Sequence, residues 1–464
     1  MATDTTHAGR RGHTLTDWRP EDATFWQNEG RAIAGRNLWI SIPCLLLAFS
    51  VWLVWSVVVN KLPAIGFDYS TNALFWLAAL PGLSGATLRI FYSFMIPIFG
   101  GRLWTTLSTA SLMIPALGIG FAVQNPDTPY WVFLALALLC GLGGGNFASS
   151  MANISYFFPK AQKGNALALN AGLGNAGVSV MQFVAPLVIT MGVFGALGGA
   201  PQTLSDGGEI WLQNAGFILV PLIAVAALAA WFGMNDIADA RASLSDQLSI
   251  LKRRQNWIMC LLYTGTFGSF IGYSAGFPLL MKTQFPEVDV LAYAFLGPLV
   301  GALSRAATGW VSDKYGGGRV TFWTFLGMIL AVVGVVWFLP LGGTAGNFWA
   351  FFACFMALFF LTGVGNASTF QMIPVIMRQE VPRLMPELDE AATRKTAERE
   401  ASSIIAFTSA IAAYGAFFIP KAYGTSIELT GGPAAALWAF ATFYAVCVAV
   451  TWAFYTRRGA PNPC

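Results

Sequence analysis

The chain has 464 residues, of which 56% are hydrophobic and only 10% are charged. Soluble globular proteins carry about 25% charged residues, so this deficit excludes an ordinary soluble enzyme and predicts a membrane protein. The formal net charge of +4 is too small to suggest nucleic-acid binding. Six cysteines form no CxxC pair, and the two histidines, His7 and His13, lie in a polar N-terminal segment. We therefore expect no metal site, no disulfide framework and no cofactor.

The apolar residues are arranged in long segments that follow a polar start. Residues 1–36 carry five arginines and no apolar stretch of signal-peptide length, so we expect an uncleaved cytoplasmic tail. A hydrocarbon core of about 30 Å takes roughly 20 helical residues to cross. We place twelve spans, at residues 37–60, 72–98, 102–123, 130–158, 164–193, 209–234, 256–281, 291–312, 320–342, 347–377, 401–424 and 433–456. The sequence thus predicts an all-α polytopic membrane protein.

Lysine and arginine outside these spans gather on one side of the membrane. The other side holds only Lys61, Lys282 and Lys421. Because cytoplasmic loops carry the excess of basic residues, we expect both termini and the loop 235–255 in the cytoplasm. The even number of spans predicts two six-helix bundles, residues 37–234 and 256–456, joined by the linker 235–255 and followed by a cytoplasmic tail, residues 457–464.

The two halves repeat similar residues at a nearly constant spacing. Arg89 and Arg305 are 216 positions apart, and Gly145 and Gly365, each followed by Asn, are 220 apart. Phe49 and Phe267 are 218 apart, in the first span of each half. Parallel duplication of this kind is typical of transporters that bind substrate near the midplane, between the halves.

Arg89 and Arg305 are the two basic residues that fall well inside predicted spans. Each precedes the glycine that opens its cytoplasmic loop by eleven positions, a depth of about 16 Å at 1.5 Å per residue, near the bilayer midplane. A charge there costs at least about 2.5–3.5 kcal/mol, and no Asp or Glu lies near the midplane of any span. The planar fork of arginine suits bidentate oxyanion binding, so the pair predicts an anion site. The alternative is that each arginine snorkels or bonds backbone carbonyls of a neighbouring helix.

Aromatic and amide side chains accompany this pair. Phe49, Phe147, Tyr263 and Phe267 are candidates to line the cavity, although a single phenylalanine in a helix is more often lipid-facing or part of the core. Asn175 lies in the glycine-rich run from Ala171 to Gly177, where its amide can donate to an anion.

Glycines and one acidic residue are candidates for packing and gating. Gly172, Gly174 and Gly177 allow close helix packing around Asn175, and packing alone is an equal explanation for them. The segment 309–319 is expected to form a structured cytoplasmic turn in which Asp313 pairs with a base or a helix N-terminus and stabilises a gate.

The segment 309–319 is similar to the loop motif G-x-x-x-D-K/R-x-G-G-x-R of the major facilitator superfamily. The run 171–177 resembles the first signature, A-G-x-G-N-x-G, of its nitrate/nitrite porter family of the bacterial NarK type. The resemblance covers nearly the whole chain, from about Asp17 to the last span. It implies the two-bundle fold, a bacterial inner membrane, the lipid bilayer as surroundings, nitrate and nitrite as substrates, and a monomer. By the same matching, Arg89 and Arg305 are the substrate arginines, and Asn175, Tyr263 and the three phenylalanines form the pocket.

Two departures from the family pattern stand out. The first-half counterpart of the loop motif has Pro97 where Asp is usual. The second signature, in the span 401–424, is usually richer in glycine and here keeps Gly415 but has Ala412 and Ala416. These alanines put in doubt how closely that helix approaches its partner, but not the anion site.

Exchange of nitrate for nitrite is the mechanism that the unpaired charges favour. An empty cleft with two desolvated like charges resists closing, whereas a bound anion partly neutralises them. Proton-coupled nitrate symport and transport of another small oxyanion remain alternatives. A proton-coupled sugar, peptide or drug carrier would need a midplane carboxylate. An anion channel would need a ring of pore-lining charges, and a membrane enzyme a cluster of His, Cys or carboxylates; the sequence shows neither.

Overall fold

The computed structural model describes residues 10–11, 13–204, 207–238, 249–340 and 345–464. The helices of the first half are α1 (Ala23–Phe25), η1 (Trp26–Gly30), α2 (Arg31–Leu53), α3 (Trp55–Val58), η2 (Pro63–Ile65), α4 (Thr71–Tyr92), α5 (Met95–Phe99), α6 (Gly101–Ala110), α7 (Met113–Ala122), α8 (Tyr130–Phe157), α9 (Lys160–Val188), η3 (Gly195–Gly198), α10 (Asn214–Phe217) and α11 (Leu219–Gly233).

The second half repeats this arrangement. Its helices are η4 (Ser249–Lys252), α13 (Arg254–Tyr263), η5 (Thr264–Gly268), α14 (Ser269–Gln284), α15 (Leu291–Ala294), α16 (Leu296–Ala307), α17 (Gly309–Tyr315), α18 (Gly317–Phe338), α19 (Phe348–Leu384), α20 (Glu390–Ala413), α21 (Gly415–Thr430), α22 (Ala434–Thr451) and η6 (Trp452–Thr456).

Five short strands form two small sheets outside the helices. The antiparallel pair β1 (Arg10–Arg11) and β2 (Thr14–Leu15) is extended by β5 (Asp236–Ile237), which runs parallel to β2. The strands β3 (Gln202–Thr203) and β4 (Glu209–Ile210) form a separate antiparallel hairpin. The first sheet ties the N-terminal segment to the end of α11.

Eleven helical stretches of the described chain are long and apolar enough to cross a membrane, and the apolar stretch Leu291–Ala307 is shorter. Together they match the twelve predicted spans, so the all-α polytopic fold is confirmed. The repeat is visible in the backbone: Gly100 (φ +84°) and Gly316 (φ +90°), 216 positions apart, open the turns before α6 and α18. Such positive φ values favour glycine.

The first membrane helix begins earlier than the hydropathy predicted. The Asp22 side chain accepts hydrogen bonds from the backbone N–H groups of Thr24 and Phe25 and caps the helix. Helical structure then continues through Val58 in one candidate span, Ala23–Val58. Residues 23–36, which we predicted as tail, are therefore helical. The linker prediction, 235–255, falls partly on residues 239–248, which lie outside the described residues.

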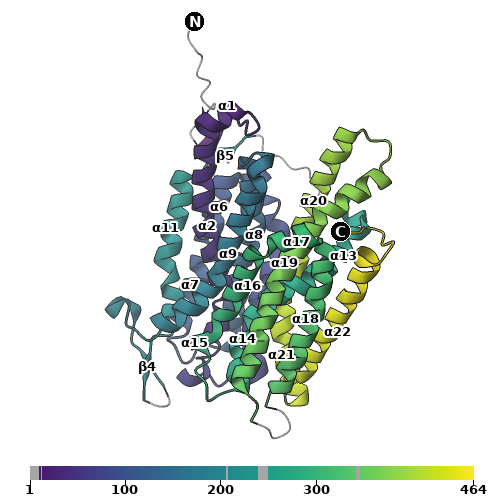
Figure 1. Ribbon diagram of the computed structural model, residues 1–464. Helices are drawn as coiled ribbons and strands as arrows, with labels where there is room; N and C mark the ends of the chain where they lie inside the picture. The colour runs from purple at the N-terminus through teal and green to yellow at the C-terminus, as the bar shows by residue number, and fades with distance from the viewer. Residues whose placement is uncertain (1–9, 12, 205–206, 239–248, 341–344) are drawn as a thin grey trace.

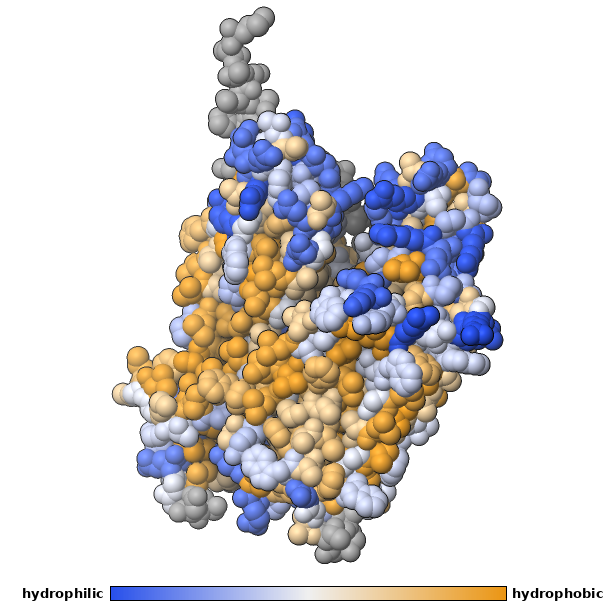
Figure 2. All heavy atoms as spheres, in the orientation of Figure 1, coloured by the Kyte–Doolittle hydropathy of each residue, from blue (hydrophilic) through white to orange (hydrophobic). Residues whose placement is uncertain are grey.

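Two ends of the molecule differ in polarity and packing. We call the end that holds α1, the α5–α6 and α17–α18 turns and residues 457–464 the basic end (Figure 1); it is the end that we expect to face the cytoplasm. Figure 2 shows two polar lobes at this end, separated by a hollow, above a broad apolar belt. An ion pair of 3.8 Å between Lys160 and Glu398 joins the two halves there.

At the opposite end the two halves are packed together. Asn72 on α4 donates to Glu428 on α21 at 2.5 Å and accepts from Lys421 at 2.8 Å. Nearer the middle, Gln182 on α9 donates to the backbone carbonyl of Ser274 on α14 at 2.7 Å. The structure is thus closed at the opposite end, whereas at the basic end a hollow separates the two lobes (Figure 2) and the Lys160–Glu398 ion pair links the halves.

Candidate functional site

Arg89 lies on α4 in a fully buried position between the two halves. Its side chain has no exposed surface. Nε donates to the backbone carbonyl of Gly144 on α8 at 3.0 Å, and Nη1 donates to the carbonyl of Ser409 on α20 at 3.1 Å. Nη2 is buried and has no hydrogen-bond partner. The guanidinium group is therefore anchored by both halves, with one nitrogen left free.

Three aromatic faces surround this guanidinium group. The ring centroids of Trp52, Phe147 and Phe267 lie 5.3, 4.8 and 5.6 Å from Arg89 Cζ. Cation–π attraction is worth about 2 kcal/mol or more when the pair is desolvated. The rings thus stabilise a buried cation without neutralising it.

A carboxylate near Arg89 would neutralise the charge, and the described residues offer none. Among the buried residues of the described chain, the one acidic side chain is Glu400, which is 5% exposed. It lies at the basic end and forms a bidentate ion pair with Arg253, in which Nε and Nη2 of the arginine donate to the two carboxylate oxygens at 2.9 and 2.6 Å. Arg89 does bond backbone carbonyls of neighbouring helices, as the alternative to an anion site predicted. Neutral carbonyls do not cancel its positive charge, however.

Arg305 on α16 occupies the corresponding place in the second half and is less enclosed. It is half-buried, and its Cζ lies 5.6 Å from the centroid of Phe370. Its Nη1 atom is buried without a partner. Each arginine therefore presents one unpaired N–H donor group to the interior of the protein.

Tyr263 and Phe267 bring the two arginines into one site. Tyr263 is 2% exposed and interacts electrostatically with both Arg89 and Arg305. Its ring stacks on Phe267 with centroids 5.4 Å apart and planes at 13°. Tyr263 immediately precedes the π-helical turn η5, and Phe267 lies within it; π-helical turns inside α-helices occur frequently at functional sites.

Phe49 and Asn175 are both buried, and neither is among the described residues that contact a guanidinium group through a ring face or a hydrogen bond. Phe49 is fully buried and packs edge-on against Phe147, with centroids 6.1 Å apart. Asn175 on α9 is 2% exposed, and its Oδ1 atom has no partner. No hydrogen bond joins Asn175 to either arginine in the described structure. Of the predicted pocket residues, the structure therefore brings Arg89, Arg305, Tyr263, Phe147 and Phe267 together, with Phe49 one ring away.

Three contributors to this site were not predicted from the sequence. Trp52 lies one helical turn after Phe49, and Phe370 lies one turn after Asn366 of the repeated Gly-Asn pair, so helical spacing could have identified both. The third is the Ser409 backbone carbonyl, which no side-chain pattern reveals.

The glycines around Asn175 differ in their surroundings. A Cβ atom on Gly177 would lie 2.0 Å from the Leu46 carbonyl oxygen, and one on Gly174 would lie 2.5 Å from Leu45. Both positions let α9 pack closely against α2. A Cβ atom on Gly172 would meet no atom within 4 Å, so close packing gives no reason for glycine at that position in this conformation.

Ala412 and Ala416 do not keep their helix away from its partners. The glycines lie on the partner helices instead: a Cβ atom on Gly82 would lie 2.4 Å from the Ala416 backbone, and one on Gly268 would lie 2.8 Å from the Ala412 carbonyl. Gly415 also packs closely, because its Cβ atom would lie 2.2 Å from the Gly268 carbonyl. The doubt raised by the alanines is removed.

The two loop turns are held differently from what we expected. Asp313 is exposed and forms no hydrogen bond or ion pair within the described chain, so the expected pairing is not present in this conformation. At the other turn, where Pro97 replaces the usual Asp, Asp236 accepts a hydrogen bond from the Arg102 backbone N–H at 2.8 Å and pairs with its side chain at 3.5 Å. A carboxylate from the end of α11 thus caps α6.

The fold and the paired arginines define a class of membrane transporter. The family model described as Major Facilitator Superfamily matches residues 44–388. The chain belongs to this superfamily and, within it, to the nitrate/nitrite porter family, as the following relatives show.

Relatives match the chain over nearly its whole length. It is 56% identical over 451 residues to a nitrate/nitrite transporter, NarU, of Salmonella typhimurium, covering 96% of this chain and 97% of that protein. It is 43% identical to a probable nitrate/nitrite antiporter, NarK2, of Thermus thermophilus, covering 98% and 99%. A solved bacterial homologue of the lysosomal transporter Spinster, in an inward-facing and occupied conformation, superposes with a TM-score of 0.59 at 15% identity, covering 89% of this chain and 93% of that one. This last likeness supports the fold alone.

Proposed function

We propose that this chain transports nitrate and nitrite across a membrane by alternating access and performs no catalysis. The names of its full-length relatives support these substrates. The observation that carries the proposal is the pair of buried, unpartnered guanidinium nitrogens, Arg89 Nη2 and Arg305 Nη1, without a carboxylate nearby in the described structure. A buried donor left unpaired costs about 1–3 kcal/mol or more when charged, so an anion bound to both would remove this cost.

The surroundings of the two nitrogens favour a small, flat, weakly hydrated anion. Arg89 is fixed by two backbone carbonyls and three ring faces, so its free nitrogen has a defined direction. The neighbouring surface is aromatic, and Tyr263 offers one hydroxyl group. A strongly hydrated divalent anion such as phosphate would lose more hydration than two donors and a hydroxyl restore. A planar monovalent oxyanion loses less hydration on entering the site, and it can lie flat against the aromatic rings.

Obligatory exchange follows from the same charges. In this conformation a hollow separates the two lobes at the basic end (Figure 2), and the two positive charges oppose closure of an empty site. A bound monovalent anion partly neutralises them, so we propose that nitrate or nitrite must be present on each crossing.

The membrane setting follows from the spans and the distribution of basic residues. We propose a bacterial inner membrane with both termini in the cytoplasm, so that the basic end faces the cytoplasm. We also propose a monomer, because each chain contains both arginines of its site.

Substrate competition in counterflow tests the proposed substrates. Purified protein is placed in liposomes loaded with nitrite, and uptake of labelled nitrate is measured with nitrate, nitrite, chloride or phosphate outside as competitor. We expect nitrate and nitrite to compete strongly and phosphate to have no effect. Stronger competition by phosphate than by nitrite would refute the assignment.

A further inference from the structure

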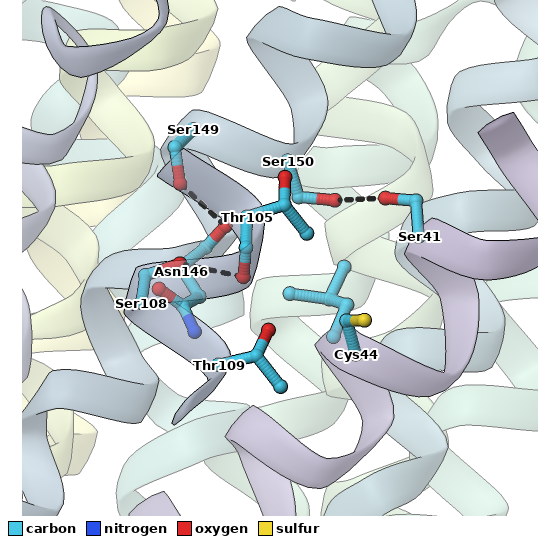
Figure 3. Close-up of a pocket in the computed structure, with 9 residues that line it drawn as sticks. Ser41, Cys44, Thr105, Ser108, Thr109, Asn146, Ser149 and Ser150 are labelled. Atoms are coloured by element: carbon cyan, nitrogen blue, oxygen red, sulfur yellow. Dashed lines mark hydrogen bonds between the residues drawn. The ribbon is translucent and has the colours of Figure 1, made fainter. Parts of the chain in front are cut away.

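A polar cavity lies inside the first bundle, between α2, α6 and α8 (Figure 3). Eight of its nine lining residues carry a hydroxyl, thiol or amide group, and Leu45 is the exception. The cavity is separate from the space between the halves, because all its walls belong to the first half. Polar groups inside a membrane bundle are costly unless they are paired.

Most of these groups are paired. The Ser41 and Ser150 hydroxyls share a hydrogen bond of 2.8 Å, and the Ser149 hydroxyl donates to the Asn146 carbonyl at 3.2 Å (Figure 3). Cys44 Sγ donates to the Ala226 carbonyl at 3.6 Å.

Two atoms in the cavity wall are short of hydrogen bonds. Asn146 Oδ1 has no partner, and Thr109 Oγ1 has none besides a contact with the Cys44 thiol; the two residues are 5% and 0% exposed. Leaving such groups unpaired costs about 1–3 kcal/mol each. The Thr109 hydroxyl can donate one hydrogen bond, and Asn146 Oδ1 can only accept. The missing partner must therefore donate to Asn146 Oδ1, and it can either accept from or donate to the Thr109 hydroxyl.

We propose that the cavity holds an ordered water molecule that bridges Thr109 Oγ1 and Asn146 Oδ1. Water both accepts and donates, and buried waters make about three hydrogen bonds to groups that otherwise lack partners. The Thr105 hydroxyl, which also lines the cavity, is the third candidate partner. A larger solute does not fit this site, because the space left between the side chains accommodates about one water.

The second half shows that the fold does not require this water. Residue Phe325 lies 216 positions after Thr109, the spacing that separates Gly100 from Gly316. Phe325 is fully buried, and its ring packs with Cys447 against Gly265. An aromatic side chain thus stands in the second half at the position that the Thr109 hydroxyl holds in the first.

The position of the water gives it a role in placing Arg89. Asn146 lies on α8 between Gly144, whose carbonyl accepts from Arg89, and Phe147, whose ring lies 4.8 Å from Arg89 Cζ. A water held by Asn146 and Thr109 ties this segment of α8 to α6. It therefore acts as a positioning element behind the buried arginine.

Native cysteines allow a direct test in the intact protein. X-ray radiolysis splits bound water into hydroxyl radicals, which oxidise the nearest sulfur. Cys44 lines the cavity and is 3% exposed; Cys447, 0% exposed beside Phe325, is the internal control. We expect Cys44, read out by mass spectrometry, to be oxidised several times faster than Cys447.

A shape-conserving variant separates bound water from protein motion. Thr109→Val removes the hydroxyl and keeps the volume, so Cys44 oxidation should fall toward the Cys447 rate, whereas Thr442→Val, on an exposed face of α22, should leave it unchanged. Equal rates for Cys44 and Cys447 in the native protein would mean a dry cavity and overturn the proposal. Rapid Cys44 oxidation that Thr109→Val does not slow would also overturn it.

Discussion

Replacing an arginine of the site by lysine keeps the charge and removes the planar fork. In Arg305→Lys, one donor of the proposed anion contact disappears, and no backbone hydrogen bond of Arg305 has to be broken in the described structure. A charge-assisted hydrogen bond is worth about 1.5–3 kcal/mol, so nitrate counterflow should fall about 10- to 150-fold. Insertion and thermal stability should change little, because Arg305 is only half-buried.

Arg89→Lys should affect both transport and stability. Arg89 reaches the Gly144 and Ser409 carbonyls from two separate nitrogens, Nε and Nη1. The three donors of lysine lie on a single nitrogen, so it cannot span both carbonyls and the anion. Each buried carbonyl left unpaired costs about 1–3 kcal/mol, so the apparent melting temperature should fall as well as uptake.

The assay is nitrate counterflow in liposomes, with the amount of folded protein measured by size-exclusion chromatography. Arg394→Lys is the matched control, because Arg394 is exposed and pairs with Glu398 along its own helix. Near-normal counterflow by Arg305→Lys would refute bidentate recognition by the arginine pair. Loss of counterflow in Arg394→Lys would show that any arginine change damages the protein, and would remove the basis for assigning the site.

Three further predictions concern packing, capping and thiol chemistry. Gly82→Ala places a Cβ atom 2.4 Å from the Ala416 backbone and should destabilise the protein by about 1–3 kcal/mol in thermal unfolding, whereas Gly172→Ala should be neutral; equal melting temperatures would contradict this. Asp236→Ala removes the cap of α6 and should cost about 1 kcal/mol, most of which Asp236→Asn should recover; no change in unfolding would show the cap to be unimportant. Burial raises the pKa of the Cys464 thiol to about 12, so its alkylation at pH 8 should be far slower than that of a peptide thiol and should rise about tenfold per pH unit; rapid, pH-independent labelling would contradict the burial.

Much of the architecture could be predicted from the sequence because the membrane imposes a simple rule. Apolar segments of about 20 residues must be helices, so the spans and their number were predictable. The depth of Arg89 and Arg305 in the bilayer stays a prediction from helical rise. The early start of the first helix could not be predicted from hydropathy. Residues 23–36 are helical because Asp22 caps the helix and because side chains such as Trp26 pack on Phe158.

The detailed surroundings of the arginines depend on tertiary contacts that no local pattern records. The Ser409 carbonyl reaches Arg89 from 320 residues away. Asp236 takes over the capping of a turn whose own motif lacks the acidic residue. The close approach of α21 to α4 depends on Gly82, on the opposite helix from the alanines that suggested a loose contact. In each case the two contacting residues are far apart in the sequence, so only the folded chain shows that they meet.

The dependence of nitrate uptake on an anion inside the vesicle tests the central claim most directly. Liposomes containing the purified protein are prepared with nitrite inside or with no permeant anion inside, and labelled nitrate uptake is measured with and without an inward proton gradient. The two unneutralised arginines predict uptake only into nitrite-loaded vesicles, with no effect of the proton gradient. Nitrate uptake into anion-free vesicles driven by that gradient would contradict exchange and establish proton symport instead.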